Sequence, residues 1–141
     1  MTLPEFLSEG WFEALAAALA RLPVEEITAD APDAGLALGQ LITEVPGEAG
    51  GANGEVRFTI VLSRDGSALL VRNSTESADV TLVEDWPTAL AIVSHTASLA
   101  DLLGAGKIKL RGNSNALVSA GGLLSRVAPL LAGALGYREA P

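Results

Sequence analysis

The chain has 141 residues, of which 49% are hydrophobic and 18% are charged. Soluble domains average about 25% charged residues, so this sequence is unusually apolar, and its length fits one domain over residues 1–141. It contains no cysteine and one histidine, which excludes disulfides, thiolate catalysis and multi-histidine metal sites. The net charge of −8 argues against a nucleic-acid partner.

The apolar excess does not predict a membrane span. A spanning helix needs about 20 apolar residues. The longest stretches without Asp, Glu, Lys or Arg are shorter than that, and they are Trp86–Ala100 and Gly112–Ser125. The N-terminus also lacks the basic residue that precedes the apolar stretch of a signal peptide. We therefore expect a cytoplasmic protein with at most transient membrane contact.

Charge is distributed unevenly along the chain. Residues 1–56 carry ten acidic residues and one basic residue, whereas residues 57–141 carry seven acidic and eight basic residues. This asymmetry predicts ion pairs between the two parts of the chain. The alternative is a basic face that touches anionic lipid headgroups.

The first part of the chain is predicted to form a helix followed by strands. Residues 9–22 have helical apolar spacing, with Ser8 as the cap and Pro23 preventing continuation, and 24–34 are expected to be irregular. Asp65-Gly66 marks a hairpin turn. Alternating or continuous apolar residues predict four strands, which are Leu36–Val45, 55–63, Ser67–Arg72 and Ala78–Glu84, the last with Val80 and Leu82 facing inward.

Helical spacing returns after the fourth strand. Asp85 is placed to cap a helix, and the apolar stripe of that helix consists of Ala89, Leu90, Ile92 and Val93. A short helix follows at Leu99–Leu103, ended by Gly104. Next comes a fifth strand, Lys107–Arg111, with Ile108 and Leu110 facing inward.

The last helical region, 115–135, is apolar on nearly every side. Gly121-Gly122 and Pro129 predict that it is kinked or divided into two parts. A helix that is apolar all round is buried on more than one side. Ordinary core packing explains any single leucine of this region, whereas the whole pattern suggests a second subunit or a cavity for an apolar ligand.

No group of residues assembles a catalytic set. His95 lies beside Ser94, but neighbours on a helix diverge, so a helix-end cap is the simpler interpretation. The carboxyl pair Glu84-Asp85 is interpreted as a solvated strand end and a helix cap. The glycine-rich loop 47–54 precedes a strand, whereas a phosphate cradle needs a helix there. We expect neither an enzyme nor a bound cofactor or metal.

Several segments, taken in order, resemble the sterol carrier protein type 2 domain family. The opening segment Phe6–Phe12, the strand Ala78–Leu82 and the strand with its turn Gly106–Asn113 are similar to the family's motifs, and the final apolar helix falls in the expected place. The family usually has Asp where Asn113 stands and a glycine within the stretch 94–97. The Gly-Gly pair is a further departure.

This resemblance implies an α+β fold. A five-stranded, mostly antiparallel sheet would begin with a three-strand meander and be covered on one face by four to five helices. The resemblance also implies an apolar tunnel between sheet and helices, closed by the C-terminal helix, that holds a fatty acid, sterol or acyl-CoA. The candidate tunnel residues are Phe58, Ile60, Val80, Trp86, Leu90, Val93, Leu103, Leu117, Leu124, Val127 and Leu131.

Core packing is the alternative role for each of these side chains. Gly121-Gly122 is interpreted as the hinge of a lid or, alternatively, as a site of close helix–sheet contact. Two other functions are considered for the whole chain. One is an interaction module with a filled core that forms a homodimer. The other is an enzyme acting on an apolar ligand, with Asp79 or Asp101 as the base.

Overall fold

The computed structural model describes residues 6–29, 31, 33, 35–47, 50, 53–93, 99–124, 126, 127 and 130, with residues 92, 93, 99 and 100 described by their backbone alone. Helices and strands follow in the order α1 (Glu9–Ala20), α2 (Val24–Thr28), β1 (Leu36–Thr43), β2 (Val56–Leu62), β3 (Ala68–Arg72), β4 (Val80–Asp85), α3 (Trp86–Val93), α4 (Leu99–Gly104), β5 (Lys109–Gly112) and α5 (Ser114–Ser119).

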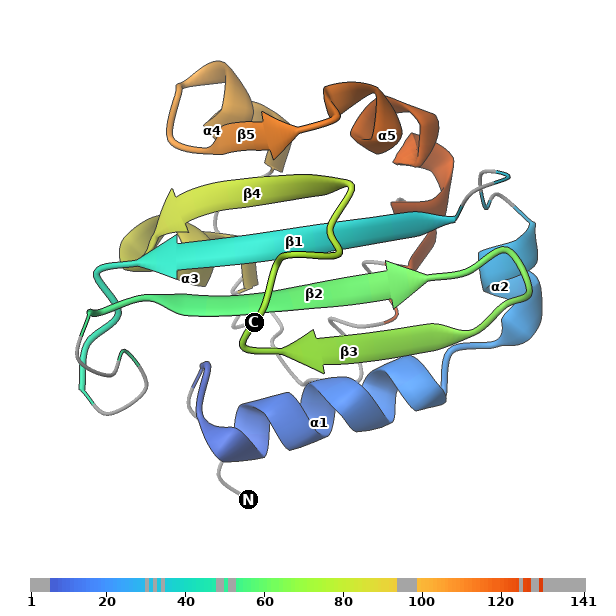
Figure 1. Cartoon of the computed structure of the whole chain (residues 1–141), viewed down its shortest axis with the longest axis horizontal. Helices are drawn as coiled ribbons and strands as arrows, with labels where there is room; N and C mark the ends of the chain where they lie inside the picture. The colour runs from blue at the N-terminus through green and yellow to red at the C-terminus, as the bar shows by residue number, and fades with distance from the viewer. Residues whose placement is uncertain are drawn as a thin grey trace, which may run out of the picture.

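The strands form one sheet with the order β3-β2-β1-β4-β5 (Figure 1). The pairs β1–β2, β2–β3 and β4–β5 are antiparallel, and β1–β4 is parallel. The predictions of an α+β fold, a mostly antiparallel five-stranded sheet and an opening three-strand meander are therefore confirmed.

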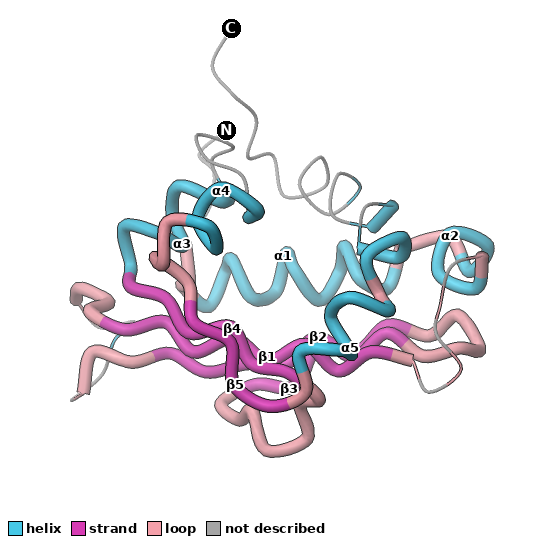
Figure 2. The backbone as a smooth tube through the Cα atoms, turned by 90° about the horizontal axis from the view of Figure 1, so that it is seen from above, coloured by secondary structure: helices cyan, strands magenta, loops and turns pink. Residues whose placement is uncertain are grey.

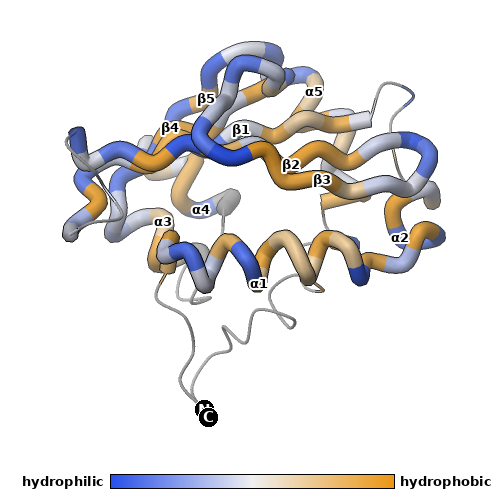
Figure 3. The backbone as a smooth tube through the Cα atoms, turned by 60° about the horizontal axis from the view of Figure 1, so that its bottom comes forward, coloured by the Kyte–Doolittle hydropathy of each residue, from blue (hydrophilic) through white to orange (hydrophobic). Residues whose placement is uncertain are grey.

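The helices lie on one side of this sheet (Figure 2). Helix α1 contacts β3, whereas α3 and α5 contact both β1 and β4. We call this side of the sheet the helix face and the opposite side the open face. The tube coloured by hydropathy shows the hydrophobic stretches in β2, β3 and α1, with hydrophilic residues in the loops that join the strands (Figure 3). The core therefore lies between the helix face and the helices.

Helix α1 forms as its sequence predicts. The Ser8 side chain accepts a hydrogen bond from the backbone N–H of Trp11 at 3.2 Å, which satisfies one of the free donors of the first turn. One face of the helix is buried, and its members recur at three- and four-residue spacing: Trp11, Phe12, Leu15, Ala18 and Leu19.

Two local predictions are wrong. Residues 24–28 form helix α2 rather than an irregular segment, because Pro23 precedes its first turn and Ile27 is buried against the core. A helix this short shows no periodicity. The burial expected of Leu110 is also wrong: Leu110 lies opposite Leu82 and so faces the predicted side, but it is 37% exposed because β5 is an edge strand.

The connection from β3 to β4 crosses the open face in front of β2 and β1 (Figure 1). The Thr59 hydroxyl donates to the Ser74 carbonyl oxygen at 2.8 Å, and Asp79 Oδ2 accepts from the backbone N–H of Ala37 at 2.9 Å. Packing is close beneath this loop, since a Cβ at Gly39 would lie 2.8 Å from the Ala78 Cβ. The loop therefore covers the middle of the open face.

The C-terminal helical region is divided, as predicted. Helix α5 is capped by the Asn113 side chain and ends at Ser119, with Ala120 as its C-cap, after which 121–124 are again helical. A Cβ at Gly121 would have no atom within 4 Å, so close helix–sheet contact does not explain a glycine there. The hinge stays a prediction.

The four ion pairs between described residues all join an acid of residues 1–56 to an arginine of residues 57–141. The pairs are Glu55–Arg57, Asp33–Arg64, Glu9–Arg72 and Glu26–Arg126, with N–O distances of 2.9 to 3.2 Å. The uneven charge is thus partly matched within the chain, as its first interpretation predicts. Exposed pairs of this kind each contribute only about 0–1 kcal/mol.

Candidate functional site

Every phenylalanine and tryptophan of the chain lies in one group of contacting rings, which we call the aromatic cluster. Its ring centroids are 5.0 to 5.9 Å apart along the contacts Phe6–Trp11, Phe6–Trp86, Trp11–Phe12, Trp11–Phe58 and Phe12–Phe58. The Arg72 guanidinium lies 4.0 Å from the centre of the Phe12 ring and also pairs with Glu9. This cluster joins α1, β2 and the start of α3 on the helix face.

Three of the candidate tunnel residues are fully buried in the core. Phe58 is 4% exposed, Val80 0% and Val127 2%. Phe58 and Val80 come from strands on either side of β1, and Val127 comes from the C-terminal helical region. These side chains therefore belong to the core between the sheet and the helices.

Five other candidates are only partly buried and pack against the same core. They are Ile60, Trp86, Leu103, Leu117 and Leu124. They come from β2, α3, α4, α5 and the following helical segment, and each retains some exposed apolar surface. Eight of the eleven predicted residues are thus brought to one interface.

The remaining three candidates are not placed there. Leu90 is 37% exposed, whereas Ala89, the residue before it on α3, is buried in the core. The side chain of Val93 and the whole of Leu131 lie outside the described residues, as do His95 and Ser94.

Glu84 is a polar residue of the helix face whose burial the sequence does not predict. It is 6% exposed, so the expected solvated strand end is wrong at this position. The strand alternation carries the signal, because Val80, Leu82 and Glu84 occupy successive buried positions of β4. Burial, together with the neighbouring Asp85 charge, raises the pKa of Glu84 to about 7.

Asp85 is the helix cap that the sequence predicts. Its carboxylate accepts a hydrogen bond from the backbone N–H of Thr88 at 2.9 Å. This hydrogen bonding, with a contribution from the Lys107 charge, lowers the pKa of Asp85. Two adjacent carboxyl groups therefore have opposite environments, one bonded at a helix start and the other buried.

Two buried side-chain atoms have no hydrogen-bond partner among the described residues. They are Glu84 Oε2 and the indole Nε1 of Trp11. Both residues belong to the apolar core region of the helix face. Buried polar atoms without partners are rare in folded proteins, so these two mark the part of the interface with unused hydrogen-bonding capacity.

The carboxylates considered for an enzymatic base are placed elsewhere. Asp79 is exposed and accepts from Ala37 on the strand backbone, and Asp101 is also exposed. Within the part of the chain that the structure describes, no three His, Cys, Asp or Glu side chains gather closely enough to hold a metal ion. No helix in that part is both long and apolar enough to cross a bilayer.

Neither a protein-family model nor a curated protein sequence matches the chain. Solved structures do. A conserved hypothetical protein from Thermus thermophilus, described as possibly a sterol carrier protein, has a TM-score of 0.66 at 20% identity, covering 97% of this chain and 92% of its own. A crystal structure of sterol carrier protein 2 has a TM-score of 0.63 at 19% identity, covering 93% and 97%.

Two further solved structures with this fold come from a palmitated carrier protein and from a larger enzyme. Palmitated SCP2L2 from Aedes aegypti matches with a TM-score of 0.53 at 18% identity, over 93% of this chain and 96% of its own. An inverting sec-alkylsulfatase from a Pseudomonas species matches at 0.55 and 19% identity, over 84% of this chain but only 16% of the enzyme. The chain therefore has the sterol carrier protein 2 fold, which also occurs as a small part of a larger enzyme.

Proposed function

We propose that this chain is a single lipid-binding carrier domain that holds a fatty acyl chain, a sterol or a similar apolar ligand between the helix face and the helices. The observation that carries the proposal is the group of half-buried apolar side chains that pack against a fully buried core and come from strands and helices distant in sequence. The fold it shares with sterol carrier protein 2, and with a palmitated relative of that protein, supports the same function.

The binding energy would come from removing ligand surface from water. Each Å² of apolar surface that is buried contributes about 25 cal/mol, so a long acyl chain binds well without many polar contacts. A half-buried side chain such as Leu103 or Leu117 would complete its burial against the ligand. Catalysis is not required for this function, and Asp79, one of the two carboxylates considered as a base, accepts a hydrogen bond from the Ala37 backbone.

The first test is native mass spectrometry of freshly purified protein, followed by binding of the fluorescent fatty acid cis-parinaric acid to delipidated protein. Replacement of a wall residue by a larger one, Leu103→Trp, should weaken binding at least tenfold while the circular dichroism spectrum stays the same. The matched control is Leu69→Trp, because Leu69 is 60% exposed on β3. A protein that carries no lipid and binds no probe would contradict the proposal.

A homodimerising interaction module is the second candidate. Exposed apolar side chains favour it at the corner where β5 meets α5, since Leu110 is 37% exposed and Val118 is 79% exposed. Light scattering separates the two candidates. A dimer that is lost in Val118→Asp, together with no lipid binding, would favour this second function.

A further inference from the structure

The unpaired carboxyl oxygen of Glu84 offers more than apolar packing to a ligand. Glu84 is more than nine-tenths buried, and its Oε2 has no hydrogen-bond partner among the described residues. It occupies the register position opposite Ile42 of β1, in the row of inward positions that contains Val80 and Leu82. The side chain is therefore held on the helix face, where the lipid of the proposed function would lie.

Glu84 lies close in sequence to a member of the aromatic cluster. Trp86 follows two residues later, and its ring lies 5.2 Å from that of Phe6, which in turn lies 5.0 Å from Trp11. The Nε1 of Trp11 is the other buried atom without a partner. One unpaired atom thus lies within the aromatic cluster, and the other belongs to a residue two positions before Trp86, a member of that cluster.

No described cation is placed to neutralise Glu84. Helix α3 contains no charged residue. By strand register, Lys109 and Arg111 of β5 lie opposite Val83 and Thr81, on the other face from Glu84. Arg72 is paired with Glu9.

Lys107 is the remaining cation near this strand end, and it acts on Asp85, whose carboxylate is already bonded to Thr88. Asp85 itself adds a second negative charge beside Glu84. Among the described residues, the charge that acts on the Glu84 carboxyl group is therefore the negative charge of Asp85.

We propose that Glu84 anchors the polar end of the bound lipid and selects an uncharged head that bears a hydroxyl group over a carboxylate head. This inference rests on the proposed lipid-binding function. A hydroxyl group donates its hydrogen to Glu84 Oε2, which supplies the missing partner without bringing a charge into the core.

Other heads fit less well. A carboxylate head would place a second negative charge against Glu84 in surroundings without a described cation, where repulsion is poorly screened. An ester head accepts hydrogen bonds but has none to donate, so an ionised Glu84 would stay unpaired beside it. The order of preference is therefore hydroxyl first, with ester and carboxylate weaker.

The test uses three probes with one polyene chain and different heads: parinaryl alcohol, methyl parinarate and parinaric acid. Delipidated full-length protein is titrated at pH 8, and energy transfer from Trp11 and Trp86, the two tryptophans of the chain, reports binding. The wild-type protein should bind the alcohol at least tenfold more tightly than the acid or the ester. In Glu84→Leu the three affinities should agree within about twofold.

Glu84→Gln provides a second variant that keeps the size of the side chain and removes its charge, and it should bind the acid more tightly than the wild type does. Glu13→Leu, which changes an exposed glutamate of α1, should leave the tenfold preference intact. Equal affinities in the wild type, or a preference that persists in Glu84→Leu, would overturn the role of Glu84 alone. Failure of all three probes to bind the wild type would overturn the lipid-binding function and this inference with it.

Discussion

The two faces of the sheet differ in whether their buried polar groups have hydrogen-bond partners within the described part of the chain. On the open face, the fully buried Thr59 donates to Ser74, and Asp79 accepts from the Ala37 backbone, so the crossing loop supplies the partners. On the helix face, Trp11 Nε1 and Glu84 Oε2 are buried without a partner among the described residues. The open face is complete within the chain itself, whereas the helix face retains hydrogen-bonding capacity for a bound molecule.

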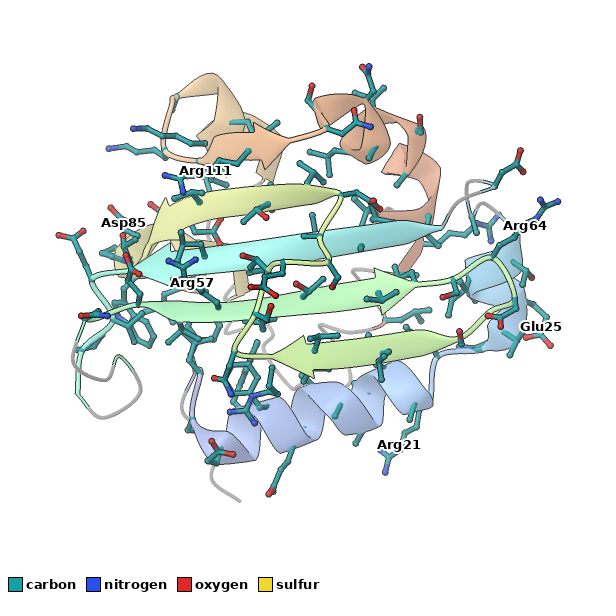
Figure 4. The ribbon with its side chains drawn as sticks, in the orientation of Figure 1. Arg21, Glu25, Arg57, Arg64, Asp85 and Arg111 are labelled. Carbon is teal, nitrogen blue, oxygen red and sulfur yellow. The ribbon has the colours of Figure 1, made fainter. Side chains whose placement is uncertain are left out.

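The faces also differ in charge. Figure 4 shows Arg57 and Arg111 on the face of the sheet turned toward the viewer, which is the open face. Arg57 pairs with Glu55 at 3.1 Å, and both remain partly solvated. The Arg57–Glu55 pair on the open face is therefore accessible to water, whereas the Glu84 carboxyl group on the helix face is buried. This contrast can be tested by substitutions on either side of the sheet.

The largest effect is expected for Phe58→Ala. Phe58 is 4% exposed and contacts the rings of Trp11 and Phe12, so its removal leaves a cavity at the centre of the aromatic cluster. We expect urea denaturation to show a loss of about 4 kcal/mol in unfolding free energy. The control on the open face, Leu69→Ala, removes a side chain that is 60% exposed and should cost less than about 0.5 kcal/mol. Similar losses in the two variants would show that the aromatic cluster is not the better-packed region.

Glu84→Gln should change how stability depends on pH. Burial raises the pKa of Glu84 from 4.5 to about 7, so between these values the folded carboxyl group holds a proton that the unfolded one has lost. Wild-type stability then falls by up to about 1.4 kcal/mol per pH unit as the pH rises through this range, and the loss is complete above pH 7.

The glutamine variant lacks this titration. Its unfolding free energy relative to that of the wild type should rise by about 3 kcal/mol between pH 4.5 and pH 8. Urea denaturation of both delipidated proteins at matched pH values measures the difference. A relative stability that does not change with pH would mean that Glu84 is solvated in the folded protein.

Asp79→Ala should have an intermediate effect on the open face. It removes the carboxylate that accepts from the Ala37 N–H at 2.9 Å and so leaves that donor without its side-chain partner. We expect thermal unfolding to show a loss of about 1–2 kcal/mol, with faster hydrogen exchange at the Ala37 amide. Glu76→Ala, in the same loop, changes an exposed side chain and should alter neither quantity. An unchanged Asp79→Ala variant would show that the loop is held by its backbone contacts alone.

The sequence predicts the strands and the first helix because their periodicity is long enough to be recognised. Val80 and Leu82 are buried and Ser8 caps α1, as expected. Helix α2 is too short for periodicity. The alternation predicts the face on which Leu110 lies but not its exposure, because it does not show that β5 is an edge strand.

Glu84 illustrates why the candidate site is harder to predict than the fold. The same alternation that places Val80 inward also places Glu84 inward, yet a carboxyl group before a helix cap is ordinarily expected to be solvated. Helix α3 packs against β4 and also against β1, which lies far earlier in the chain, and the sequence around Glu84 does not show that packing. Whether the Glu84 carboxyl group has a hydrogen-bond partner across this interface depends on the tertiary structure, so the sequence alone does not predict it.

The smallest effect is expected for Asp85→Asn, which separates the two neighbouring carboxyl groups. Asn is as good a helix cap as Asp, so the bond to the Thr88 N–H should persist and the unfolding free energy should change by less than about 0.5 kcal/mol. The Asp85 charge is the second cause, after burial, of the raised pKa of Glu84, so its removal should lower that pKa. A carbon-13 NMR titration of the Glu84 carboxyl group measures the shift, with Glu76→Gln as a control in which the pKa of Glu84 should not move.

A raised or unchanged pKa in Asp85→Asn would mean that the cap carboxylate does not act on Glu84. Burial alone would then set the charge state of the proposed anchor.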